Sequence, residues 1–194
     1  GRRVTFEVHV GNVHSDLRIG PNVVGAKPLL ANDHLASMGY ATGSRGFFLA
    51  GSIDKFSEEL ELVKPMINPD ELTGRYRAKT VIDAFHVETE RDLRQRFPQC
   101  YQHLKDKVFP TRAENNDPKL REYWWKFRRA NTEYRSLVRD IGRFVATAET
   151  TKHRMFSFVG KPNEIEHGAI AFGLHDAEYL AIMSGRIHVQ WSLA

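Results

Sequence analysis

The 194-residue chain has a single cysteine, Cys100. One thiol cannot form an internal disulfide, so a fold of this chain depends on a packed core rather than on covalent cross-links. Cys100 lies in a segment with helical periodicity, and we predict that it is a small buried residue rather than a nucleophile. A lone cysteine also suits a reducing compartment, and we expect a cytoplasmic protein.

Long apolar runs are missing as well. The stretch over residues 168–174 is far shorter than the ~20 residues that a membrane-spanning helix needs. The first residues show no signal-peptide pattern. Hydrophobic residues make up 41% of the chain and charged residues 27%, which is typical of a globular domain. We therefore expect a folded protein without a membrane partner.

Catalytic signatures are missing too. The sequence has no glycine-rich dinucleotide or phosphate loop, no His-Glu-x-x-His zinc helix and no Gly-x-Ser-x-Gly elbow. The Asn-Pro-Pro-Tyr tetrapeptide of amino-methyltransferases is also absent. We assign no catalytic, cofactor-binding or metal-binding residue to this chain. A small metal-dependent hydrolase that uses Asp83, His86 and His153 remains an alternative.

Positive charge is concentrated in one third of the sequence. Residues 91–154 contain 16 Lys and Arg against 8 Asp and Glu, although the formal net charge of the chain is only +4. A local excess of this kind is typical of surfaces that bind nucleic acid.

The hydrophobic pattern predicts an α+β fold, as a single mixed domain over residues 1–194 with short antiparallel strand pairs, several helices and a C-terminal helix. Helical spacing predicts an amphipathic helix over residues 53–63, with Glu59 among the carboxylates that face water. Thr89 is expected to cap a helix that bends or breaks at Pro98. We expect a polar loop over residues 112–117, and a closing helix that is capped by Asp176 and has a candidate break at residues 184–185. Strands are predicted over residues 3–10, 47–49, 79–85, 143–147, 155–159 and 169–172.

Residues 123–129 interleave aromatic rings with the cations Lys126, Arg128 and Arg129. Such a mixture can stack on bases and neutralise phosphates, so we consider these three residues candidates for DNA contact. The alternative is that the aromatic residues belong to the core while the cations face solvent.

A second candidate is the turn that contains Thr151, Lys152, His153 and Arg154 between two predicted strands. Its hydroxyl and cationic groups could bind a phosphate or reach base edges, although such a turn can also be only a solvated surface. Weaker candidates of the same kind are Lys27, Arg45 and Arg143.

Successive short motifs resemble those of one protein family, the MmeI-like (type IIL) restriction-modification DNA methyltransferases, and in particular their target-recognition domain. The matching motifs occur in the same order as in the family, and they cover most of the chain. The matching segments are residues 22–29, 31–32, 38–39, 46–47, 81–85, 97–98, 108–112, 124–125, 150–154 and 184–191. Gly185 and the pair His86-Val87 depart from the more common family residues.

The resemblance implies that this chain reads a duplex DNA sequence through the major groove. It further implies that the catalytic domain, which transfers a methyl group from S-adenosylmethionine to adenine N6, lies outside this chain together with a nuclease domain. The expected partners are then double-stranded DNA and those two domains of the same bacterial polypeptide, and this chain alone is not expected to be an enzyme. Alternatives are a recognition module of a type I specificity subunit, and a scaffold domain without a nucleic-acid role.

Overall fold

The computed structural model describes residues 29–51, 53–77, 79–151 and 153–192, together with residues 7, 8, 10, 11, 13 and 27. The strand predicted over residues 3–10 lies mostly outside the described residues, and so does Lys152. The fold is mixed α+β, as the hydrophobic pattern predicted. The strands are β1 Ala36–Met38, β2 Phe48–Leu49, β3 Val63–Ile67, β4 Thr80–Ile82, β5 Arg143–Ala148, β6 Ser157–Gly160, β7 Glu164–Ile165 and β8 Ala169–Phe172.

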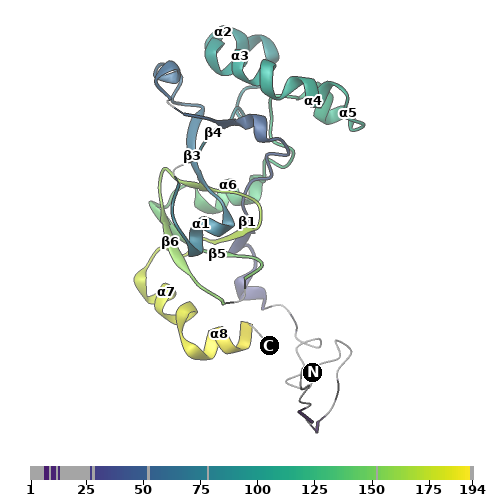
Figure 1. Cartoon of the computed structure of the whole chain (residues 1–194). Helices are drawn as coiled ribbons and strands as arrows, with labels where there is room; N and C mark the ends of the chain where they lie inside the picture. Colours follow the sequence, from purple (N-terminus) through teal and green to yellow (C-terminus); the bar gives the residue numbers. More distant parts are fainter. Residues whose placement is uncertain are drawn as a thin grey trace, which may run out of the picture.

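Helices separate and flank these strands (Figure 1). The α-helices are α1 Pro69–Thr73, α2 Glu90–Arg96, α3 Pro98–Lys107, α4 Phe109–Ala113, α5 Pro118–Glu122, α6 Thr132–Val138, α7 Ala177–Ser184 and α8 Arg186–Ser192. Short 3-10 helices cover Leu30–Asn32, Arg45–Phe47 and Asp54–Phe56. Helices α2 to α5 lie at one end of the molecule and α7 with α8 at the other, with both sheets between them (Figure 1).

The first sheet has the strand order β1-β8-β5-β6 and is antiparallel throughout. Strand β5 lies inside this sheet, between β8 and β6, and is buried at every position after Arg143. The predicted strand over residues 169–172 is confirmed with its bounds, and the one over residues 155–159 begins two residues later.

The second sheet has the order β2-β4-β3-β7, in which β7 runs parallel to β3. Only residues 166–168 separate β7 of this sheet from β8 of the first sheet. This short connection therefore brings the two sheets side by side, and the candidate site forms at their junction.

The predicted helix starts and stops around Pro98 are confirmed. The Thr89 hydroxyl accepts a hydrogen bond from the amide of Asp92 and caps α2. Helix α2 ends before Pro98, which begins α3, since proline fits the first helical turn but cannot continue a helix. The closing helix is indeed broken at Gly185, although the side chain of Asp176 makes no capping hydrogen bond.

The helix predicted over residues 53–63 is wrong. One 3-10 turn, Asp54–Phe56, is present, and Val63 already begins β3. Glu59 does not face water: it is 5% exposed, and its carboxylate accepts the backbone amides of Gln99 and Cys100 at 2.8 and 2.7 Å. The first turn of α3 has no side-chain cap of its own, so this distant carboxylate satisfies its free amides.

The polar loop predicted over residues 112–117 is partly wrong as well. Helix α4 extends to Ala113, and Arg112 is buried, with 2% of its surface exposed. A charged side chain in a polar stretch of sequence is normally predicted to lie at the surface. Only the tertiary structure shows the loop that covers Arg112.

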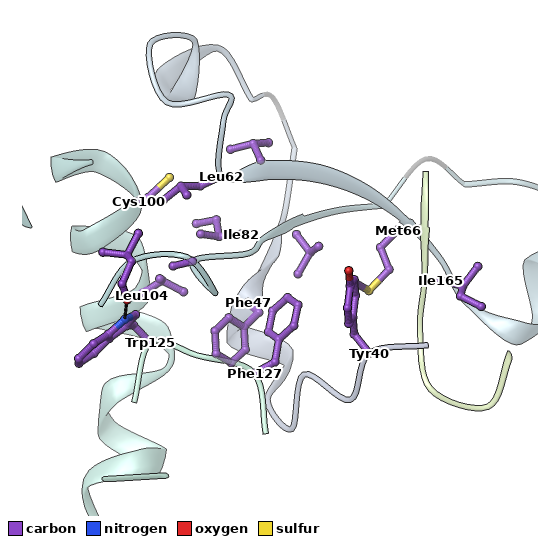
Figure 2. Packing of buried hydrophobic residues seen from close by; sticks show 14 of the residues in the cluster. Tyr40, Phe47, Leu62, Met66, Ile82, Cys100, Leu104, Trp125, Phe127 and Ile165 are labelled. Carbon is purple, nitrogen blue, oxygen red and sulfur yellow. Dashed lines mark hydrogen bonds between the residues drawn. The ribbon is translucent and has the colours of Figure 1, made fainter. Parts of the chain in front are cut away.

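One hydrophobic core extends from the helices to the junction of the sheets. Figure 2 shows it running from Cys100 and Leu104 on α3, past Ile82 on β4, to Tyr40 and Ile165. Cys100 is buried as predicted, and its burial, together with the nearby Glu59, raises the pKa of the thiol. Within the described residues, no helix is both long and apolar enough to span a bilayer.

Candidate nucleic-acid interface

Three segments that are distant in the sequence meet at the junction of the two sheets. Residues 40–42 lie between residues 128–129 on one side and residues 166–167 on the other. The amide of Arg129 donates to the carbonyl of Ala41 at 3.0 Å, and the amide of Arg128 donates to Thr42 at 3.2 Å. On the other side, the amide of His167 donates to the carbonyl of Tyr40 at 2.8 Å. We call these three segments together the platform, and its backbone is held by hydrogen bonds between neighbouring segments.

Two glycines make this meeting of segments possible. A Cβ atom at Gly39 would collide with the carbonyl oxygen of Ile165, so only glycine lets the chain pass β7 at this distance. Gly43 has φ of +70°, a left-handed conformation that glycine adopts without steric cost. A Cβ atom there would also lie 2.7 Å from the Cβ atom of Arg128.

The platform carries a groove made of three adjoining hollows. The middle hollow contains Arg128, Arg129, Glu166 and His167. The second shares Glu166 with it and adds Arg45 and Lys79, and the third shares Arg129 and His167 with it and adds Asn131 and Glu133. We call this surface the basic groove. Its charged members are Arg45, Lys79, Arg128, Arg129, Glu133 and Glu166, and it also contains His167.

The four Arg and Lys side chains of the basic groove make no direct polar contact with other side chains that the structure describes. Within the described part of the chain, none of them forms an ion pair or a side-chain hydrogen bond. Arg45, Arg128 and Arg129 are exposed, and Lys79 is half-buried. These cations are therefore available to an anionic ligand.

A second hollow with several cations, near α6, differs in this respect. There Lys64 and Arg135 both bind the buried carboxylate of Asp83, at 3.2 and 2.9 Å. Lys161 pairs with Glu164 at 3.4 Å. Three of the four cations that line this hollow are thus paired with carboxylates, and only Arg139 has no ion pair in the described residues. The basic groove offers more unpaired cations, so it is the stronger candidate for binding an anion.

Arg112 adds a buried positive charge beneath the basic groove. Its Nη2 atom donates a 2.8 Å hydrogen bond to the carbonyl of Thr42, and its Nε atom has no hydrogen-bond partner among the described residues. Burial, with a contribution from the charge of Arg128, lowers the pKa of Arg112. Arg112 therefore supports the loop at residues 42–43 and contributes to the positive potential of the groove.

Glu166 is the carboxylate in the middle of the groove. Burial raises the pKa of this half-buried side chain, while the charges of Lys79, His167 and Arg45 act in the opposite direction and that of Glu71 adds to the increase. Its presence among cations means that the groove is not uniformly positive.

The three cations of residues 123–129 do not all lie at the same site. Arg128 and Arg129 line the basic groove with Arg45, so three predicted residues from two distant segments come together. Lys126 points elsewhere: its Nζ atom lies 3.8 Å from Glu88 and 5.5 Å from the ring centre of Tyr123.

Three of the four aromatic residues of the same stretch belong to the core, and only Tyr123 is exposed. Trp124, Trp125 and Phe127 are 2%, 4% and 6% exposed. Both indole nitrogens are used inside the protein, by the carboxylate of Glu90 and the carbonyl of Val87. These side chains therefore stabilise the fold and are not available to stack on bases.

The turn between β5 and β6 lies at the same end of the first sheet's strands as residues 166–168. The amide of Glu149 donates to the carbonyl of Gly168 at 2.7 Å. Thr151 and His153 are half-buried and exposed, respectively, and Arg154 donates from Nη1 to the carbonyls of Ala148 and Glu149. Arg154 thus closes the turn, and DNA contact by this turn stays a prediction.

Arg143 and Lys27 are not part of the basic groove. Arg143 begins β5, at the end opposite to that turn, where its Nε atom donates to the carbonyl of His175 and its guanidinium lies 4.0 Å from the ring centre of Phe158. Lys27 is exposed and lines none of the hollows in the described residues that form the groove.

Sequence reasoning missed Lys79, Glu166 and His167. Each is an isolated charged or polar residue beside a short strand, without a local pattern that marks a site. The excess of cations over residues 91–154 did indicate Arg128 and Arg129, but their neighbours come from segments outside that range.

The alternative metal site is not assembled in the described residues, where no group of three metal-ligating side chains occurs. The Asp83 carboxylate is occupied by Lys64 and Arg135. His86 lies in the hollow that also contains Lys161, a residue that directly follows β6. His153 lies before the opposite end of β6, so the two histidines are not brought together.

A search of solved structures relates this fold to a known protein. The chain is similar to the type IIL restriction-modification enzyme MmeI, whose structure was determined in complex with DNA, with a TM-score of 0.65 and 15% sequence identity. The two share a fold. The match covers 93% of this chain but only 25% of the MmeI chain. No protein-family model and no curated protein sequence matches this chain.

Proposed function

We propose that this chain binds duplex DNA along the basic groove, as the target-recognition domain of an MmeI-like restriction-modification methyltransferase. The observation that carries the proposal is a set of cations at the junction of the sheets that have no ion pair with any described residue, namely Arg45, Lys79, Arg128 and Arg129. Cations that the protein leaves unpaired can neutralise phosphates and release condensed counterions, which provides most of the affinity of non-specific DNA binding.

The fold supports the same proposal. MmeI, with which the chain shares its fold, was solved bound to DNA, and this chain corresponds to a quarter of that enzyme. In the proposed parent protein, a separate catalytic domain would bind S-adenosylmethionine and methylate adenine N6, and a nuclease domain would accompany it. This chain would hold the duplex and read its sequence while the target base is flipped out of the stack. We place such a protein in the bacterial cytoplasm.

Salt-dependent binding tests the proposal. Fluorescence anisotropy of a labelled mixed-sequence duplex would be measured with the wild-type chain at several salt concentrations between about 50 and 200 mM. We expect dissociation constants of about 10⁻⁴ to 10⁻⁶ M at physiological salt and a steep loss of affinity as salt increases. The Arg128→Ala/Arg129→Ala variant should bind at least about tenfold more weakly, and its logarithmic salt slope should be smaller by about 0.9 per lost phosphate contact.

A matched control removes the same charge elsewhere. Arg91→Ala/Arg94→Ala changes two exposed arginines on α2, at the end of the molecule away from the first sheet (Figure 1). This variant should retain both the affinity and the salt slope of the wild type. Equal effects of the two double variants would refute the basic groove as the binding site, and a wild-type chain that binds no duplex at low salt would refute DNA binding itself.

A further inference from the structure

Glu166 occupies a central position in the basic groove. It borders both the hollow that contains Arg128 and Arg129 and the hollow that contains Arg45 and Lys79. If these cation pairs bind phosphates, as the proposed function requires, the carboxylate lies between the two backbone-binding positions. In that arrangement, Glu166 would face the base edges inside a groove of the DNA rather than a phosphate.

The backbone holds Glu166 in a fixed position. Its amide donates to the carbonyl of Ile67 at 2.9 Å, and it forms a parallel bridge with Tyr40. The next residue, His167, continues this pairing through its own amide. A side chain on such a segment starts from a fixed backbone position, which limits the ligand groups that its carboxylate can reach.

The carboxylate of Glu166 is free to accept hydrogen bonds. In the described residues, no ion pair or side-chain hydrogen bond involves it, although Lys79 and Arg45 contribute to its electrostatic environment. Its burial has already removed part of its hydration, which raises its pKa. A partly desolvated carboxylate needs a hydrogen-bond donor when a ligand displaces the remaining water.

We infer that Glu166 reads one base of the target by accepting a hydrogen bond from an exocyclic amino group in the major groove. Cytosine N4 and adenine N6 present such a donor there, whereas guanine O6 and thymine O4 present acceptors that a carboxylate repels. Cytosine is the favoured base, because a carboxylate is the usual partner of its amino group. This inference rests on the proposed function of the basic groove and adds a specificity-determining residue to it.

Selection from a randomised duplex library tests the inference. The wild-type chain, Glu166→Ala and Glu166→Gln would each be used to enrich bound duplexes, which are then sequenced. We expect the wild type to prefer cytosine or adenine at one position by about tenfold. Glu166→Ala should lose this preference alone, and Glu166→Gln should shift it toward adenine, since an amide can bind adenine N6 and N7 together.

The control is Glu133→Gln, which removes the other carboxylate at the edge of the groove and should leave the preference at that position unchanged. Thermal unfolding of each variant establishes that it is folded. If the variants bind duplex DNA with the same base preferences as the wild type, or if the wild type binds without any preference, Glu166 is not a reading residue although DNA binding stands. If the wild type enriches no duplex at all, the proposed function fails and this inference fails with it.

Discussion

Gly43 packs directly against Arg128 in the basic groove. A Cβ atom at Gly43 would lie 2.7 Å from the Cβ atom of Arg128 and 3.3 Å from the Nη2 atom of the buried Arg112. The position of Arg128 therefore depends on the absence of a side chain at Gly43, a residue that itself has no charge to bind a ligand.

Replacing Gly43 with alanine should weaken DNA binding by displacing Arg128. The substitution also has a conformational cost of about 1–2 kcal/mol, because an L-residue at φ of +70° is strained. Gly51→Ala is the matched control: Gly51 has φ of +82°, but a Cβ atom there would contact nothing within 4 Å. Both variants should lose unfolding free energy in denaturant titrations, Gly43→Ala the more because its Cβ atom also meets Arg128, and only Gly43→Ala should lose duplex affinity. Equal affinities of the two variants would contradict the link between Gly43 and Arg128.

Replacing Asp83 with asparagine should destabilise the protein by about 3–5 kcal/mol near neutral pH, because it leaves the mostly buried Arg135 and the nearby Lys64 without their carboxylate. The exposed Asp140→Asn variant should stay within about 0.5 kcal/mol of the wild type. Urea unfolding of the three proteins measures the difference.

The same site predicts how stability depends on pH. Burial acts to raise the pKa of Asp83, but the hydrogen bonds and charge of Arg135, together with Lys64, outweigh it and hold this pKa below its usual value. A carboxyl group with a lowered pKa stabilises the fold above its unfolded pKa of about 3.9, and the stabilisation is lost as pH falls through the folded pKa. The difference in unfolding free energy between wild type and Asp83→Asn should therefore shrink below about pH 4. A difference that stays constant down to low pH would contradict the assignment.

Glu59 provides a prediction about the helical end of the molecule. Because its carboxylate satisfies two amides of the first turn of α3, Glu59→Ala should lower the unfolding free energy by about 2–4 kcal/mol. The neighbouring Glu58→Ala, at an exposed position, should change it by no more than about 0.5 kcal/mol. Chemical denaturation followed by tryptophan fluorescence would detect this contrast, and a similar small effect of both substitutions would show that Glu59 does not stabilise α3.

These residues illustrate how much of the fold could be predicted from local pattern. The cap at Thr89, the break at Pro98 and the bounds of β8 depend on signals within a few residues of sequence, and all three are confirmed. The prediction that Glu59 faces water was wrong, because the burial of Glu59 depends on the free amides of α3, which lie about forty residues away in the sequence. Helical spacing over residues 53–63 could not reveal that distant partner.

The candidate site was predictable only in part, for the same reason. Arg128 and Arg129 were visible as cations in a basic stretch, but the platform that orients them depends on backbone pairing with Ala41 and Thr42. Glu166 was invisible as a candidate, since a single carboxylate before a strand matches no motif. Its position at the centre of the groove appears only when β7 joins the second sheet and β8 joins the first.

The most direct test of DNA binding through the basic groove is amide chemical-shift mapping of the isotopically labelled chain with a mixed-sequence duplex. We predict that added duplex shifts the amide signals of residues 41–46, 127–131 and 166–168, while those of α2 and α3 stay in place. Shifts confined instead to the hollow around Arg139 and Lys161, or no shifts at low salt, would contradict the account.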